Sequence, residues 1–159
     1  MNSSSPNRRR FGLGLVAATA SLTVPPQLWA AASPLIKVVR NAGCGCCLLW
    51  GRHLEANGFK VEMTERNDMA AYKASLGITS ALESCHTGMI DGYVIEGHVP
   101  AEAIKRLLAQ KPDAIGLSVP GMPIGSPGME GGTPEVYEVI LFSKSGTASF
   151  GRWKGSAAV

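Results

Sequence analysis

Beyond its first 32 residues, the chain lacks any excess of positive charge. The whole sequence holds 15 lysines and arginines against 12 aspartates and glutamates, but the three arginines at positions 8 to 10 precede residue 33 and no acidic residue does. The rest of the chain therefore carries 12 charges of each sign. Because clustered positive charge drives binding to nucleic acid and to acidic membrane surfaces, the composition argues against both kinds of partner.

The N-terminal segment also lacks an apolar run long enough to span a bilayer. Its apolar stretch, Phe11 to Val24, follows the basic run Arg8 to Arg10 and precedes the small residues Ala30 to Ala32. This order is typical of a cleaved secretory signal peptide. We therefore predict that residues 1–32 are an export signal and that the mature protein, beginning near Ser33, is periplasmic without a membrane span. An uncleaved anchor is the alternative.

The signal also shows features of the twin-arginine type, which exports proteins that are already folded. Asn7-Arg8-Arg9-Arg10-Phe11 resembles that motif, although Gly12 stands where a more apolar residue would strengthen it. The general secretory route and the twin-arginine route both stay open.

Residues 33–159 show no internal repeat and are enough for one domain whose core needs no disulfides. Their patterns predict strands at 36–40, 59–63, 88–90, 93–96, 137–142 and 147–153, and helices at 48–57, 69–76 and 100–110. A strand, a cysteine motif, a helix, a strand and a second helix open a thioredoxin-like fold. We therefore predict a single thioredoxin-like α/β domain at 33–159, with a central mixed sheet flanked by helices.

Cysteines are few, but three of the four, Cys44, Cys46 and Cys47, fall within four residues. They stand between a predicted strand and a predicted helix, where unpaired backbone N–H groups and the helix dipole favour the thiolate. Cys44 and Cys47 have the spacing that closes a disulfide or chelates one ion. A structural disulfide with Cys46 bonded to Cys85 is the alternative, but a pair three residues apart closes almost no loop and stabilises little.

The fourth cysteine lies in the motif Ser84-Cys85-His86-Thr87, just before a predicted hairpin. In thioredoxin-like proteins the loop entering this hairpin faces the cysteine motif. We therefore predict that Cys85 and His86 belong to the same site as the other cysteines. A surface-loop role for His86 is the alternative.

The remaining two histidines are assigned structural roles. His98 just precedes the predicted helix at 100–110. His53 stands seven residues after Cys46, which on a helix is roughly 10 Å along the axis and too far for a shared ion. We interpret His53 as a packing residue or as a residue that supports the site from behind.

Glycine and proline dominate the stretch from Val119 to Pro134, which can be neither a helix nor an interior strand. Loops of this length usually have a function. Met122 and Met129 supply thioether sulfurs, which are soft, uncharged donors that suit Cu(I). The alternative is that each methionine only packs as a hydrophobic side chain.

Taken together, the motifs resemble the CopG-like copper-resistance family, small periplasmic metal-binding proteins that also carry a domain-of-unknown-function label. The motifs are Asn41–Cys47, Ser84–Thr87, Gly97–Pro100, Gly121–Pro123 and Gly128–Glu130, within a resemblance that runs from about Ile36 to Trp153. The resemblance implies a thioredoxin-like fold, cysteine-bound copper and a role in copper resistance or copper redox handling. The ligands that it implies are Cys44, Cys46, Cys47 and Cys85, with His86, Met122 and Met129 as further candidates.

The spacing of the cysteines bears on the metal. Three thiolates within four residues crowd a single tetrahedral zinc ion, whereas a Cu(I) cluster tolerates crowding because one sulfur can bridge two ions. We predict Cu(I), as more than one ion, with zinc as the alternative metal; four separate ligands for an iron–sulfur cluster are hard to draw from this spacing.

Two functions follow from these observations. The first is a periplasmic copper-binding or copper-redox protein, whose partners are copper ions and other copper-handling proteins. The second is a thiol–disulfide oxidoreductase that uses Cys44 and Cys47. Cys46 and Cys85 discriminate between the two, because a dithiol enzyme does not need them.

Overall fold

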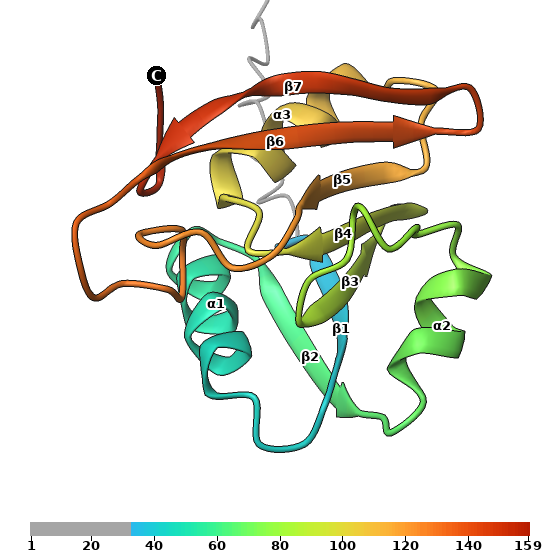
Figure 1. Ribbon diagram of the computed structural model, residues 1–159, viewed down its shortest axis with the longest axis horizontal. Coiled ribbons are helices and arrows are strands. Elements are labelled where there is room, and N and C mark those ends of the chain that lie inside the picture. Colours follow the sequence, from blue (N-terminus) through green and yellow to red (C-terminus); the bar gives the residue numbers. More distant parts are fainter. Residues whose placement is uncertain (1–32) are drawn as a thin grey trace, which may run out of the picture. The chain divides into compact units, whose positions relative to one another are not determined.

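The computed structural model of the protein describes residues 33–159, so the predicted export signal lies outside the described residues. The elements are β1 (Leu35–Arg40), α1 (Gly45–Ala56), β2 (Lys60–Glu65), α2 (Met69–Ser75), β3 (His86–Ile90), β4 (Tyr93–Gly97), α3 (Ala101–Gln110), β5 (Gly116–Val119), β6 (Val136–Ser143), β7 (Gly146–Lys154) and β8 (Ala157–Ala158) (Figure 1). Within this part of the chain, no helix is long and apolar enough to cross a membrane.

All eight strands of this region form one mixed sheet in the order β2-β1-β3-β4-β5-β6-β7-β8. The parallel pairs β1–β2 and β4–β5 are joined through α1 and α3, because parallel neighbours need a crossover connection. The hairpin β3–β4 turns at Asp91 and Gly92, with φ of 48° and 83°. Both values are positive, which is why an Asp-Gly pair suits this two-residue turn.

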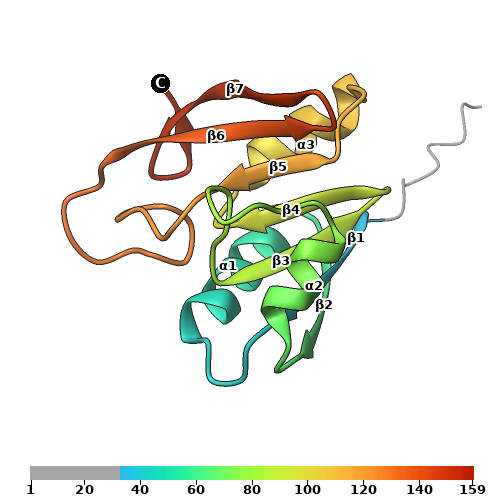
Figure 2. The same cartoon turned by 45° about the vertical axis from the view of Figure 1, so that its right-hand side comes forward.

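The helices cover both faces of the sheet (Figures 1 and 2). Helices α1 and α3 share the larger core, where the indole N–H of Trp50 donates to the carbonyl of Val99 at 2.9 Å. Ile78 and Leu82, which follow α2, pack in a second cluster with Val94 of β4. Val94 and its neighbour Ile95 point into different clusters, as the alternation of a strand requires.

These observations confirm a mixed α/β protein with, in the described residues, one eight-stranded sheet and three helices. The sheet is larger than that of a typical thioredoxin fold, so the thioredoxin-like assignment is not confirmed. Strands β5 and β8 were absent from the prediction; they are four and two residues long, too short for a clear periodic signal.

Two boundaries matter for the site. Helix α1 begins at Gly45, three residues before the predicted start, so Cys46 and Cys47 lie in its first turn and Cys44 is its N-cap residue. Strand β3 begins at His86, two residues before the predicted start, because His86 pairs with Arg40 of β1. His86 is therefore a strand residue and not part of a loop.

Candidate metal centre

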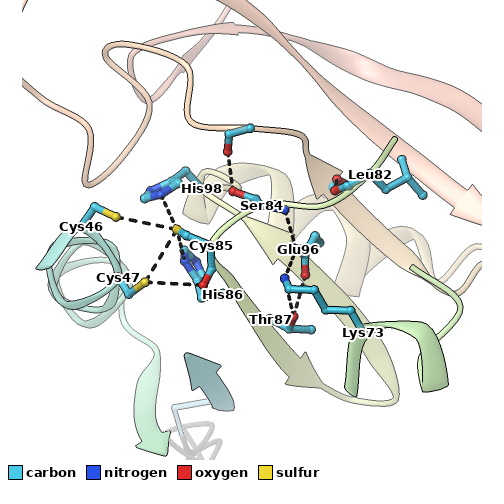
Figure 3. A network of polar contacts seen from close by, with 12 residues as sticks. Cys46, Cys47, Lys73, Leu82, Ser84, Cys85, His86, Thr87, Glu96 and His98 are labelled. Atoms are coloured by element: carbon cyan, nitrogen blue, oxygen red, sulfur yellow. Dashed lines mark hydrogen bonds and ion pairs between the residues drawn. The ribbon is translucent and has the colours of Figure 1, made fainter. Parts of the chain in front are cut away.

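The N-terminal end of α1 and the entry to β3 bring the four cysteines together. Figure 3 shows Cys46 and Cys47 of α1 beside Cys85. The Sγ atom of Cys46 lies 3.4 Å from that of Cys44 and 3.7 Å from that of Cys85, and Cys47 lies 3.7 Å from Cys85. All four sulfurs lie within 4.8 Å of one another. Cys85 is thus beside the first cysteine motif, although 38 residues separate it from Cys47.

Cys44 and Cys47 are joined by a disulfide, with Cα atoms 5.5 Å apart, whereas Cys46 and Cys85 are free and half-buried. The alternative arrangement, in which Cys46 is bonded to Cys85, is not what the structure shows. The four sulfurs can all become thiolates only after the disulfide has been reduced.

A buried ion pair holds the segment that carries Cys85 (Figure 3). Glu96 of β4 is fully buried and pairs with Lys73 of α2, which is 4% exposed. The Oε1 atom of Glu96 accepts the backbone N–H of Ser84 at 2.7 Å, and Oε2 accepts the hydroxyl of Thr87 at 2.6 Å. The residues on both sides of the Cys85-His86 pair are therefore tied to one carboxylate. The sequence analysis missed this network.

His86 points to the opposite face of the sheet from Thr87, toward α1. Its ring lies 4.2 Å from that of Trp50, and its Nδ1 atom lies 3.3 Å from the Sγ atom of Cys85. The side chain is fully buried, so the surface-loop alternative is wrong. Its Nε2 atom is buried and has no hydrogen-bond partner among residues 33–159.

His98 also lies at the centre, although a structural role was expected for it. Its Nε2 atom is 3.2 Å from the Sγ atom of Cys85, and its Nδ1 atom is 2.8 Å from the carbonyl oxygen of Pro127. A signal for this existed in the sequence. Cys85 and His98 each stand six residues out from the Asp91-Gly92 turn, so hairpin register places them opposite each other.

His53 lies away from the sulfurs, as predicted for a packing residue. Its Nε2 atom accepts the backbone N–H of Ala101 at 3.1 Å, at the start of α3. That N–H is one of the donors that a helix leaves unpaired at its N-terminus. His53 therefore joins α1 to α3.

Burial sets the protonation of the centre. It raises the pKa of Cys85 to about 12, and the negative charge of Cys46 adds to the effect. Cys85 lies outside α1, so the helix N-terminus that is expected to favour the thiolates of the other cysteines does not offset this rise in its pKa. Burial also lowers the pKa of His98, and it lowers that of His86 well below its usual value, helped by the positive charge of His98 and Lys73. At neutral pH the histidines are therefore neutral, and a metal must displace the proton of Cys85.

The Gly/Pro-rich loop lies against α1 near the sulfurs. A Cβ atom on Gly128 would come within 2.7 Å of the carbonyl oxygen of Cys46 and within 2.8 Å of the backbone nitrogen of Trp50. Met129, the next residue, is half-buried, whereas Met122 is 52% exposed. Of the two predicted thioether ligands, Met129 is therefore the more shielded from solvent, and it adjoins the glycine that packs against α1.

The donor set fits a soft metal ion. Four sulfurs and two imidazole nitrogens converge, and sulfur with nitrogen suits copper and zinc while it does not suit magnesium or calcium. The sulfur atoms of Cys44 and Cys46, of Cys46 and Cys85, and of Cys47 and Cys85 lie 3.4 to 3.7 Å apart. Each of these separations is short enough for two sulfurs to share one ion.

The chain is similar to solved structures of proteins named for copper resistance. Two solved structures, described as copper resistance protein CopG, forms 1 and 2, are each 47% identical to this chain, with TM-scores of 0.72. They cover 77% and 76% of this chain and 99% and 98% of their own. The chain belongs to the CopG-like copper-resistance family. A family described as "Protein of unknown function, DUF411" also matches, over residues 82–129. None of the curated proteins compared with the chain matches it.

These matches confirm the resemblance to the CopG-like family that the sequence motifs indicate. Together with the cysteine cluster, it supports a copper-related role. The matched segment at 82–129 contains Cys85, the two histidines near it in space, His86 and His98, and both loop methionines, Met122 and Met129.

Proposed function

We propose that the protein is a periplasmic copper-binding protein that holds Cu(I) on the thiolates of Cys44, Cys46, Cys47 and Cys85. The observation that carries the proposal is the convergence of the four sulfurs within 4.8 Å. Soft thiolates prefer Cu(I) among the biological oxidation states of copper. The short separations between the sulfurs support thiolates that bridge more than one ion.

His86, whose Nδ1 atom lies 3.3 Å from the Sγ atom of Cys85, and Met129 are further ligands in this proposal, and Met122 is available from the exposed part of the loop. Bound copper would supply a one-electron couple. The protein would supply the sulfur-rich, half-buried environment that favours the reduced ion and limits the access of water. A single thioredoxin-like domain, with the cysteine motif at the start of α1, belongs to the same proposal.

The disulfide gives the proposed site two redox states. Reduction by a dithiol partner breaks the Cys44–Cys47 bond, adds two electrons and two protons to the pair and converts the partner into a disulfide. Four ligands are then available, and each loses its proton when copper binds. Loading of Cu(I) on all four thiolates is therefore expected only in the reduced protein.

The substitution Cys46→Ser tests the proposal. Cu(I) is titrated anaerobically into reduced protein in competition with a coloured Cu(I) chelator. The variant should bind fewer Cu(I) ions than the parent, whereas the control Leu49→Ser, at a position of α1 that is 46% exposed, should bind as many. If Cys46→Ser binds as much Cu(I) as the parent, the copper proposal is wrong.

A thiol–disulfide oxidoreductase is the second candidate, and the disulfide between Cys44 and Cys47 favours it. Such an enzyme passes this disulfide to a substrate dithiol and needs neither Cys46 nor Cys85. Exchange with a dithiol peptide should then survive Cys46→Ser and disappear in Cys47→Ser. Loss of exchange in both variants would argue against this function.

Export is proposed from the N-terminal segment alone. The intact mass of the protein in the periplasmic fraction should correspond to a chain that begins at or near Ser33. Finding the full chain, with Met1 attached, in the membrane pellet would overturn this expectation. Other periplasmic copper-handling proteins are the expected partners of the exported protein.

A further inference from the structure

Cys85 and the two histidines beside it form a group that the disulfide does not involve. The ligand atoms of Cys85, His86 and His98 lie within 4.8 Å of one another. His86 and His98 are fully buried and Cys85 is half-buried. The three are therefore available as ligands in the state in which Cys44 and Cys47 are bonded to each other.

The spacing of the three donors matches a single ion. The Sγ atom of Cys85 lies 3.2 Å from Nε2 of His98 and 3.3 Å from Nδ1 of His86. Zn–S and Zn–N bonds of about 2.3 and 2.0 Å at a tetrahedral angle separate the two ligand atoms by about 3.5 Å. Each of these two separations is within about 0.3 Å of that value, and the donor atoms of His86 and His98 lie within 4.8 Å of each other.

Hydrogen bonding orients His98 as a ligand. The carbonyl oxygen of Pro127 can only accept, so Nδ1 of His98 carries the proton and donates it at 2.8 Å. In the neutral ring Nε2 then presents its lone pair toward Cys85. Donation of the second ring N–H to a backbone carbonyl is the usual arrangement of metal-bound histidines.

His86 has no such constraint. Its Nε2 atom meets no hydrogen-bond partner in the described part of the chain, so no contact there prevents the proton from moving to Nε2. Nδ1, which faces Cys85, is then free to bind an ion. Trp50 packs against the ring and keeps it in this orientation.

We propose that Cys85, His86 and His98 form a second metal site that binds one divalent transition-metal ion, Zn(II) or Cu(II), in the disulfide-bonded protein. One thiolate with two imidazoles is a donor set that suits divalent zinc and copper, in contrast to the all-sulfur set of the reduced protein. The incoming ion displaces the thiol proton of Cys85 to solvent, and no electron is transferred.

The proposal deepens the proposed function, because Cys85 belongs to both sites and the two modes exclude each other. Reduction of the disulfide favours Cu(I) on four thiolates, and its formation leaves the Cys85–His86–His98 site for a divalent ion. The redox state of Cys44 and Cys47 would then select which ion the protein carries.

Cobalt(II) is the probe for a first test, because it does not oxidise thiols and its thiolate complexes absorb strongly. The full exported protein is prepared with the disulfide formed, and titration of two free thiols after denaturation verifies this state. One equivalent of Co(II) should bind with a thiolate-to-cobalt charge-transfer band. Zn(II) should displace it. Absence of the band at saturating Co(II) would overturn the proposal.

Variants then identify the ligands. The band should persist in Cys46→Ser and disappear in Cys85→Ser. Loss of an outer-shell partner costs about 10- to 100-fold in metal affinity, so His98→Ala, which removes a ligand itself, should weaken Co(II) binding at least about 100-fold. The control His53→Ala should bind like the parent. Equal loss in Cys46→Ser and Cys85→Ser would show a different site and refute the assignment.

A measurement on the parent protein covers the case in which a histidine variant fails to fold. Zn(II) should slow alkylation of Cys85 in the disulfide-bonded protein and leave Cys46 reactive, as peptide mass spectrometry can show. Equal rates at Cys85 with and without Zn(II) would refute the site.

The two proposals can fail separately. If the oxidised protein does not bind Co(II), the number of Cu(I) ions that the reduced protein binds is unaffected. Failure of the Cu(I) titration leaves the cobalt spectrum and the protection of Cys85 to be judged by themselves.

Discussion

The substitution Glu96→Gln should destabilise the protein and loosen the metal centre together. Glu96 is fully buried, and its carboxylate is paired with Lys73 and accepts hydrogen bonds from Ser84 and Thr87. Glutamine keeps the shape but removes the charge. The ammonium group of Lys73, whose side chain is 5% exposed, is then left buried without a counter-ion.

The expected cost follows from this burial. Removing one partner of a buried ion pair costs about 3–5 kcal/mol, a fifth or more of the roughly 5–15 kcal/mol that stabilises a typical domain. An exposed ion pair contributes about 0–1 kcal/mol. Glu65→Gln, which breaks the pair with Arg40 at a side chain that is 54% exposed, is therefore the matched control.

Urea unfolding of the reduced, metal-free protein measures the effect, with circular dichroism as the signal. Adding Lys73→Met to Glu96→Gln should restore most of the lost stability, because the uncompensated charge is removed. Cu(I) affinity should fall in Glu96→Gln, since the N–H of Ser84 beside Cys85 loses part of its anchor. The reasoning is refuted if Glu96→Gln costs no more than Glu65→Gln, or if Lys73→Met deepens the loss.

Three further outcomes are expected. Gly128→Ala should lower the free energy of unfolding by about 1–3 kcal/mol more than Gly121→Ala, because both glycines have positive φ but only Gly128 packs against α1. Equal losses of stability in urea unfolding would contradict this. Met129→Leu should weaken Cu(I) binding more than Met122→Leu, and the reverse order in the chelator competition would reject Met129 as a ligand. Burial lowers the pKa of all three histidines, so below about pH 6.5 the unfolded chain binds more protons than the folded protein. The free energy of unfolding should therefore fall as the pH is lowered from 7 to 5, by up to about 1.4 kcal/mol per pH unit for each histidine. If urea unfolding gave the same free energy of unfolding at pH 7 and pH 5, this expectation would be contradicted.

Local features of the chain were predictable because they depend on neighbours in sequence. The cysteine motif stands at a strand–helix junction and the Asp91-Gly92 turn closes a hairpin, both as predicted. The predicted loop from Val119 to Pro134 holds no helix or strand apart from Val119, which is the last residue of β5. The family could also be recognised from the motifs, since their order along the chain is specific. The export signal stays a prediction.

Tertiary structure decided the parts of the site that join distant segments. Nothing near Lys73 or Glu96 in sequence marks them as partners, because their contact requires α2 to pack over β3 and β4.

His98 lies between these cases. Hairpin register, readable from the turn, already placed it opposite Cys85. Only the fold, however, brought Pro127 of the loop against its Nδ1 atom and thereby turned Nε2 toward the sulfur. A sequence determines which residues can meet along one hairpin, because backbone pairing is local. The packing of separate elements decides which atom of a side chain faces its neighbour.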